Sequence, residues 1–261
     1  MKRAGKALSE SSPALVLILA VLLVWQFGQP LIGVPTYILP TPSIILGALV
    51  KGLPRLGIHL AVTLKEIVLG FLIGDVIGIA LALAIHKVRF LERSLYPIII
   101  FFQNVPKIAI APIFVLWFGY GMAPKIVVVV VISFFPVVVN TLYGLRAVDP
   151  NLLDLVHSVS GTPLQLLTKV ELPNSLPYMF EGFKIAITFS VIGAIVGEWV
   201  GSDNGLGFLI LLSSAQLETD RLFAAITVVS LVGVALFYLI GVAERLLLPW
   251  EKAGHRASQS I

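Results

Sequence analysis

Three polar residues interrupt one long apolar stretch of this sequence. Gln103, Asn104 and Lys107 flank Pro106 within residues 94–118. Polar groups at membrane depth usually face protein or water, and they often mark the path of a solute or ion. These side chains could therefore line a solute cavity. A simple helix break at Pro106 is an equally good reading of the same residues.

Two carboxylates lie in other apolar stretches. Asp75 is near the middle of the stretch 59–85, where it could contact a solute or be a satisfied packing group. Glu198 lies at the end of the stretch 176–200, where it could meet a docking protein or cap a helix. We therefore take both residues as candidate site residues.

Patterns for catalysis, nucleotide binding and metal binding are missing. Gly52 and Gly57 have the spacing of a phosphate-binding loop, but Ile58 and His59 follow where Lys and Ser or Thr are required. The four histidines are far apart, and there are no cysteines. We expect neither an enzyme nor a metal site. The energy for uphill transport would have to come from a partner or an ion gradient.

The composition indicates a membrane protein. The 261 residues are 58% hydrophobic and 12% charged, with a mean hydropathy of +1.00, whereas soluble domains carry about 25% charged residues. The net charge of +4 comes from scattered basic residues, which argues against nucleic-acid binding.

Six apolar stretches are each near or above the roughly 20 residues needed to cross a bilayer. They predict an all-α membrane protein with one domain, 13–250, between tails at 1–12 and 251–261. Twelve Lys or Arg residues fall on the side of the N-terminus and four on the other, so we expect both termini in the cytoplasm. The stretches are 14–32, 59–85, 94–118, 125–145, 176–200 and 222–248.

Small residues recur every fourth position in two of these stretches. Gly70, Gly74 and Gly78 do so in the second stretch, and the same spacing returns at 193, 197 and 201. This pattern lets helices approach closely, so we expect two tight helix contacts. The sequence leaves open whether the helix that packs on each glycine face belongs to this chain or to a second copy.

The segment between the fourth and fifth stretches is amphipathic. Asp149-Pro150 and Thr162-Pro163 each resemble a helix start, Ser160-Gly161 a turn and Leu172-Pro173 a stop, which predicts two short helices. Their apolar stripe must be buried against this chain's own helices, in the lipid interface or in a partner's groove. The stripe comprises Leu152, Leu155, Val156, Val159, Leu164, Leu167 and Val170.

This segment resembles the EAA loop of ABC importer permeases. Asp154-Leu155-Val156 stands where that loop has Glu-Ala-Ala, and Leu172-Pro173 has the spacing of its final Leu-Pro. Ser160 holds the place of the family's glycine, and the glycine of this chain follows at Gly161. The resemblance implies that the 149–175 segment is a coupling loop for an ATPase. The residues it assigns to that contact are Asp154, Leu155, Val156, Val159, Ser160, Gly161, Leu172 and Pro173.

Further motifs extend the resemblance to the nitrate, sulfonate and taurine type of these permeases. They are Pro106-Lys107-Ile108-Ala109, Trp117-Phe118-Gly119-Tyr120-Gly121, Gly197-Glu198 and Gly205-Leu206-Gly207. Members of this family sit in the bacterial inner membrane. The resemblance implies a second permease copy, a cytoplasmic ATPase dimer that binds ATP and magnesium, and an extracytoplasmic binding protein that delivers the solute. No cofactor is implied in this chain.

The solute is suggested by a narrower resemblance. Asn104 to Lys107, Phe134 to Pro136 with Asn140, and Gly197 to Trp199 are most similar to permeases for a pyrimidine precursor of thiamine, with riboflavin permeases nearby. Sulfonate, taurine, nitrate and bicarbonate types are alternatives. A stand-alone secondary transporter is the alternative class, although the chain shows no repeat of the kind those proteins often have.

Overall fold

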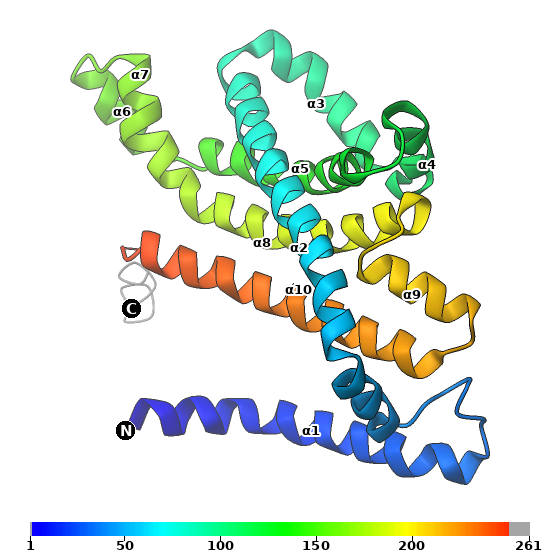
Figure 1. The fold of residues 1–261 in the computed structure, drawn as a ribbon. Helices are drawn as coiled ribbons and strands as arrows, with labels where there is room; N and C mark the ends of the chain where they lie inside the picture. Colours follow the sequence, from blue (N-terminus) through cyan, green and yellow to red (C-terminus); the bar gives the residue numbers. More distant parts are fainter. Residues whose placement is uncertain (1, 251–261) are drawn as a thin grey trace.

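The computed structural model of the protein describes residues 2–250, and the predicted tail 251–261 lies outside them. Within the described residues every regular element is a helix (Figure 1). In chain order the elements are α1 (Lys2–Ile32), α2 (Pro42–Lys87), α3 (Arg89–Gln103), α4 (Lys107–Phe118), α5 (Met122–Arg146), α6 (Pro150–Ser158), α7 (Pro163–Leu166), the π-helical segment η1 (Leu167–Glu171), α8 (Leu172–Gly201), α9 (Leu206–Ala215) and α10 (Thr219–Leu247).

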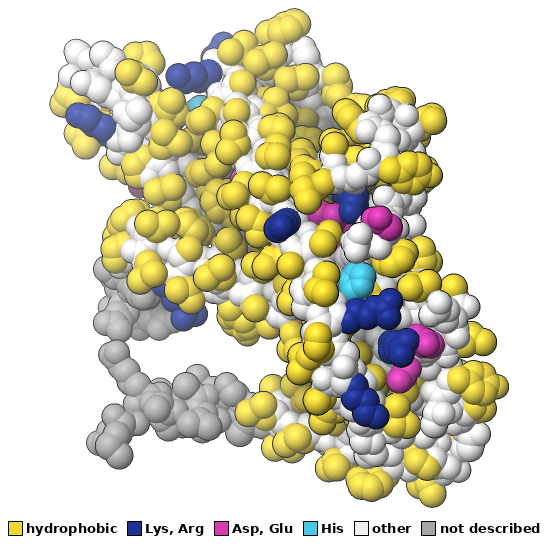
Figure 2. All heavy atoms as spheres, in the orientation of Figure 1, with side chains coloured by type: hydrophobic (Ala, Val, Ile, Leu, Met, Phe, Trp, Pro, Cys, Tyr) yellow, Lys and Arg dark blue, Asp and Glu magenta, His cyan; other side chains and the backbone are white. Residues whose placement is uncertain are grey.

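Five segments of the described chain are long and apolar enough to cross a membrane, and the bent pair α3–α4 brings the number to six if it is one span. This confirms the predicted all-α membrane fold. One predicted boundary was wrong, because the helix of the second span begins at Pro42 instead of near residue 59. The first candidate span is Pro13–Ile32, and α1 extends from it back to Lys2. Apolar side chains cover much of the surface in Figure 2, as expected for a protein in lipid.

The centre of the bundle is formed by α2, α5 and α8. Gly74 and Gly78 of α2 face Ser133 and Val137 of α5, so these two helices run in the same direction. On α8, Gly193 and Gly197 pack against Val129 and Lys125 of α5 in the opposite direction. Both glycine faces therefore contact α5 of the same chain. Apolar residues of the three helices form a continuous buried cluster around these contacts.

The contact at Gly78 should not tolerate a side chain. A Cβ atom at Gly78 would lie 2.9 Å from Val137 Cβ and 3.0 Å from the Phe134 carbonyl oxygen. We expect Gly78→Ala to lower the free energy of unfolding by about 1–3 kcal/mol, because α2 and α5 must move apart. Gly57→Ala on the same helix is the matched control. A Cβ there meets nothing within 4 Å, so that change should stabilise by about 0.5–1 kcal/mol. Thermal unfolding in detergent measures both, and equal shifts would contradict the close contact.

The fifth span continues directly from the hairpin. α7, η1 and α8 form one helical segment of 39 residues, Pro163–Gly201, so the predicted helix stop at Leu172-Pro173 was wrong. The Leu172 amide bonds to the Leu167 carbonyl five residues back, and this π turn lies just before Pro173. A proline in the first turn of α8 needs no partner for an N–H group. The π turn therefore carries the chain through the proline without a break.

Candidate functional site

The 149–175 hairpin projects from one end of the bundle, at the upper left of Figure 1. Both predicted caps are present. Asp149 accepts a hydrogen bond from the Asn151 amide at 2.9 Å, and Thr162 and Gln165 form a reciprocal capping box. Neither α6 nor α7 has a buried residue. The hairpin is therefore locally stable. The part of its apolar stripe on α6 and α7 is not fully covered by the rest of the chain, whereas Leu167 in η1 is buried.

The turn between α6 and α7 is tight. Ser160 has a φ of 52°, the left-handed conformation that favours glycine. Gly161 packs on Val156, where a Cβ atom would lie 2.5 Å from Cγ1. The serine therefore holds a glycine-type conformation, and the glycine beside it provides the space.

The predicted coupling residues lie in two places. Leu155 and Val159 are 58% and 69% exposed on α6. Leu172 is half-buried and Pro173 is exposed at the start of α8, away from the turn. The outer part of the hairpin comprises Asp154, Leu155, Val159 and Ser160, with Val156 partly covered beneath Gly161.

Polar contacts attach the base of the hairpin to the bundle. His86 at the end of α2 lies 3.0 Å from the Glu171 carboxylate. Asn174 donates a hydrogen bond to the Gly144 carbonyl of α5 at 3.1 Å. Motion of the hairpin would therefore be transmitted to α2, α5 and α8 together.

The third span is broken at Pro106, where α3 and α4 meet at an angle of 100°. Lys107 begins α4, and its Nζ lies 4.5 Å from the ring centroid of Phe135. Because Phe135 is near the middle of the 25-residue α5, Lys107 lies level with the middle of that helix, where it is half-buried. A cavity of about 460 Å³ opens in this elbow. Lys107 lines it together with apolar residues that include Phe102, Phe114, Phe134 and Phe135.

Asp75 is buried at a similar depth on α2, since its neighbour Gly74 faces Ser133 of α5. Its Oδ1 has no hydrogen-bond partner among the described residues. Asp75 is not one of the residues that line the elbow cavity. The structure thus places Gln103, Asn104 and Lys107 together at the helix break and Asp75 on a separate helix.

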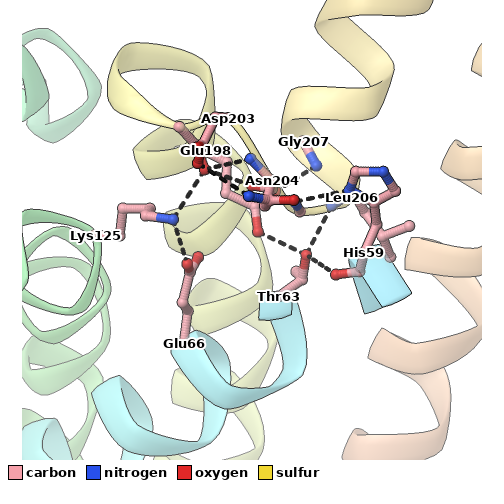
Figure 3. Close-up of polar contacts among 11 residues, drawn as sticks. His59, Thr63, Glu66, Lys125, Glu198, Asp203, Asn204, Leu206 and Gly207 are labelled. Atoms are coloured by element: carbon pink, nitrogen blue, oxygen red, sulfur yellow. Dashed lines mark hydrogen bonds and ion pairs between the residues drawn. The ribbon is translucent and has the colours of Figure 1, made fainter. Parts of the chain in front are cut away.

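A buried polar cluster (Figure 3) lies near the C-terminal end of α8, whose other end joins the hairpin. We define it as His59, Thr63 and Glu66 of α2, Lys125 of α5 and Glu198 of α8. Lys125 Nζ lies 2.6 Å from Glu66 Oε1. The Thr63 hydroxyl donates to Glu198 Oε1 at 2.6 Å. Each of the five side chains is at most 7% exposed.

This cluster holds the turn before α9. The amides of Gly205, Leu206 and Gly207 donate to His59 Nδ1, Thr63 Oγ1 and Glu198 Oε2, at 3.0, 2.8 and 2.5 Å (Figure 3). The Glu198 carboxyl therefore caps the N-terminus of α9, where negative charge is favoured. With 1% exposure its side chain does not reach the surface, so a contact with a docking protein would require this turn to open.

Comparisons with known proteins agree with this architecture. Residues 74–248 match the family model described as binding-protein-dependent transport system inner membrane component. The chain is 41% identical to a probable ABC transporter permease protein of Haemophilus influenzae, over 87% of this chain and 92% of the relative. It is 36% identical to the formylaminopyrimidine transport permease protein ThiX of Halalkalibacterium halodurans, over 97% and 99% of the two chains.

The fold also resembles a solved structure. An inward-facing conformation of the MetNI methionine ABC transporter superposes with a TM-score of 0.61 at 21% identity. The match covers 72% of this chain and 92% of the other. This likeness supports the arrangement of the helices.

Proposed function

The chain belongs to the family of binding-protein-dependent transport inner membrane components and is the permease subunit of an ABC importer, and on that premise we propose that its 149–175 hairpin docks on a cytoplasmic ATPase. ATP and magnesium bind to that partner and supply the energy. The hairpin transmits the motion of the ATPase to the membrane helices. The solute then passes when the permease opens alternately to the two sides of the membrane.

The exposed apolar stripe of α6 is the observation that carries this proposal. Leu152, Leu155 and Val159 are 46%, 58% and 69% exposed on a capped helix that extends beyond the bundle. Amphipathic helices commonly bind by laying such a face into a groove of a partner. The helices of the hairpin have capped N-termini, and its base is attached to the bundle. Both features suit a segment that transmits motion.

A single thiol tests the docking. The chain has no cysteine, so Leu155→Cys introduces one thiol at the centre of the stripe. We expect it to cross-link to cysteines placed along the groove of the ATPase, with a yield that changes when ATP is added. Rapid labelling by a lipid-soluble maleimide, without any cross-link, would place the stripe in the bilayer interface and contradict the proposal.

We place the solute path at the elbow of α3 and α4, with Gln103, Asn104 and Lys107 as contacts and Asp75 as a further candidate. Two observations support a contact between Lys107 and a solute. Lys107 lies beside Phe135 in the middle of α5, and it lines the adjacent cavity. Flat aromatic solutes suit the phenylalanine rings that line this cavity.

Lys107→Gln should lower solute uptake into vesicles by about tenfold, because a hydrogen bond to a charged group contributes about 1.5–3 kcal/mol. Lys65→Gln, at an exposed lysine on α2, is the matched control. Uptake by the assembled importer with its loaded binding protein measures both variants. Equal uptake by the two variants would remove Lys107 from the path.

For the solute we propose a pyrimidine precursor of thiamine or a related vitamin such as riboflavin. The 36% identity to ThiX is matched by 35% to the riboflavin transport system permease protein RibX of Chloroflexus aurantiacus. Sulfonate, taurine, nitrate and bicarbonate are the alternatives. Calorimetry with the binding protein that serves this importer should show micromolar or tighter binding of the pyrimidine or flavin. Selective binding of a sulfonate or of an inorganic anion would overturn the choice.

The remaining assembly follows from the same premise. We propose that the domain 13–250 pairs with a second permease copy in the bacterial inner membrane, with both termini in the cytoplasm. The start of α1 and the end of α10 lie on the same side of the bundle as the hairpin (Figure 1), which supports this orientation. An extracytoplasmic binding protein would then dock at the opposite end, near α9.

A further inference from the structure

We propose that the buried polar cluster is a proton-binding site, in which Glu66 and Glu198 share one proton and this proton keeps the turn before α9 closed. The inference concerns residues that the proposed coupling and the proposed solute path do not use. It stands whichever solute is carried.

The charges of the cluster do not balance without such a proton. Glu66 and Glu198 are 0% and 1% exposed, and in the part of the chain that the structure describes Lys125 is the one cation paired with them. His59 accepts a hydrogen bond at Nδ1 from the Gly205 amide, so its ring is neutral. Two ionised carboxylates and one ammonium would leave one net negative charge in a buried site, and an unpaired buried charge is costly.

The hydrogen bonds indicate which residue carries the proton. Both oxygens of Glu198 already accept hydrogen bonds, from Thr63 and from the Gly207 amide. Apart from the ion pair with Lys125, neither oxygen of Glu66 has a hydrogen-bond partner among the described residues. The two carboxyl groups interact with each other, and the proposal joins them by a hydrogen bond. Such a bond needs a proton on one of them, and a proton on Glu66 gives that residue the partner it lacks.

Other charged groups around the site do not replace the proton. Arg55 lies one turn before His59 on α2, and its charge acts on the imidazole. Asp203 on the turn accepts a hydrogen bond from the Asn204 amide group and is a further acid, not a cation. The charged residue that α5 supplies to the site is Lys125, and the one that α8 supplies is Glu198. The helix α9 has no charged residue. The excess charge is therefore negative, and a proton compensates it.

Loss of the proton would weaken the closed turn. Two carboxylates in contact repel, and the repulsion would displace Glu198 from the Thr63 hydroxyl and the Gly207 amide. The turn Gly205-Leu206-Gly207 would then lose an anchor, and the N-terminus of α9 would be freed. The turn should therefore be closed at neutral pH and open as the pH rises.

Infrared spectroscopy of the assembled importer in lipid nanodiscs tests the proton directly. We expect the carbonyl-stretch band of a protonated carboxylic acid at neutral pH, and we expect Glu66→Gln to remove intensity from it. Asp75→Asn is the matched control, because it removes a buried carboxyl group outside the cluster. The band intensity that Glu66→Gln removes should persist in Asp75→Asn. No intensity lost in Glu66→Gln would overturn the proposal.

Hydrogen exchange of the Leu206 and Gly207 amides tests the consequence. After correction for intrinsic rates, we expect protection in the unmodified protein to fall by about tenfold from neutral to alkaline pH, the loss expected from one or two hydrogen bonds. Glu66→Gln keeps a donor for Glu198 and should stay protected at both pH values. Glu198→Gln should lose protection at both. The same pH response in Glu66→Gln as in the unmodified protein would show that Glu66 does not hold the proton.

Discussion

Leu155→Asp should separate the permease from its ATPase. Leu155 lies at the centre of the exposed stripe of α6, and a carboxylate there would have to enter an apolar groove without a partner. Central interface residues often contribute about 2 kcal/mol or more, so we expect binding about thirtyfold weaker. The ATPase recovered with the tagged permease after detergent extraction measures the effect. ATP-driven uptake should fall with it.

The control for Leu155→Asp is His157→Asp on the same helix. His157 is also exposed but lies about 200° further around α6, away from the stripe. It adds the same charge at the same end of the molecule. Because α6 has no buried residue, neither change should alter the thermal unfolding of the bundle. If both variants lose the ATPase equally, added charge is responsible and the stripe is not the contact.

Local patterns predicted the hairpin well. Asp149-Pro150 and Thr162-Pro163 act as caps because the chemistry of a cap is contained within three or four neighbouring residues. The same local reasoning failed at Pro173. A proline removes one amide donor, which favours a helix stop. The bond from the Leu172 amide to the Leu167 carbonyl avoids that stop, and a π turn has no signature in the sequence.

The buried polar cluster was the larger omission. Glu66 and Lys125 are far apart in the sequence, and nothing in one sequence pairs them. A weaker signal was present on α2, since His59, Thr63 and Glu66 are spaced at i, i+4 and i+7 and share one helical face. α9 was missed for a related reason. A largely apolar stretch of ten residues is too short to cross a bilayer, so the residues after Gly205 indicated only a loop.

The continuous segment Pro163–Gly201 links the two sites. At about 1.5 Å per residue its 39 residues span about 58 Å, more than the roughly 30 Å of a hydrocarbon core. One end carries α7 of the hairpin, and the other carries Glu198 of the buried polar cluster. A rotation imposed at the hairpin would therefore reach the turn before α9 through the backbone of a single helix, without an intervening loop.

Deleting Thr168 and Lys169 together should uncouple the two ends of this segment. Removing one residue converts the π turn of η1 into an ordinary α-helical turn with little rotation, because a π turn holds one residue more than an α turn. Removing the second rotates α6 and α7 by about 100° relative to α8. The apolar stripe itself is unchanged, so we expect the ATPase still to be recovered with the permease. Stimulation of ATP hydrolysis by the loaded binding protein, and uptake with it, should fall by about tenfold or more, because the docked hairpin would push α8 in the wrong direction. This outcome differs from that of Leu155→Asp, which should lose the ATPase itself.

Thr168→Ala is the matched control for the deletion. It removes the hydrogen bond from the Thr168 hydroxyl to the Leu164 carbonyl, at 2.8 Å, but keeps the number of residues. The contact between His86 and Glu171 lies on the α8 side of the deletion and should form in both variants. We therefore expect normal stimulation in Thr168→Ala and loss in the deletion. Stimulation that survives the deletion would show that the hairpin does not act through the rotational setting of α8, and the coupling would then have to run through the contacts of the hairpin base with α2 and α5.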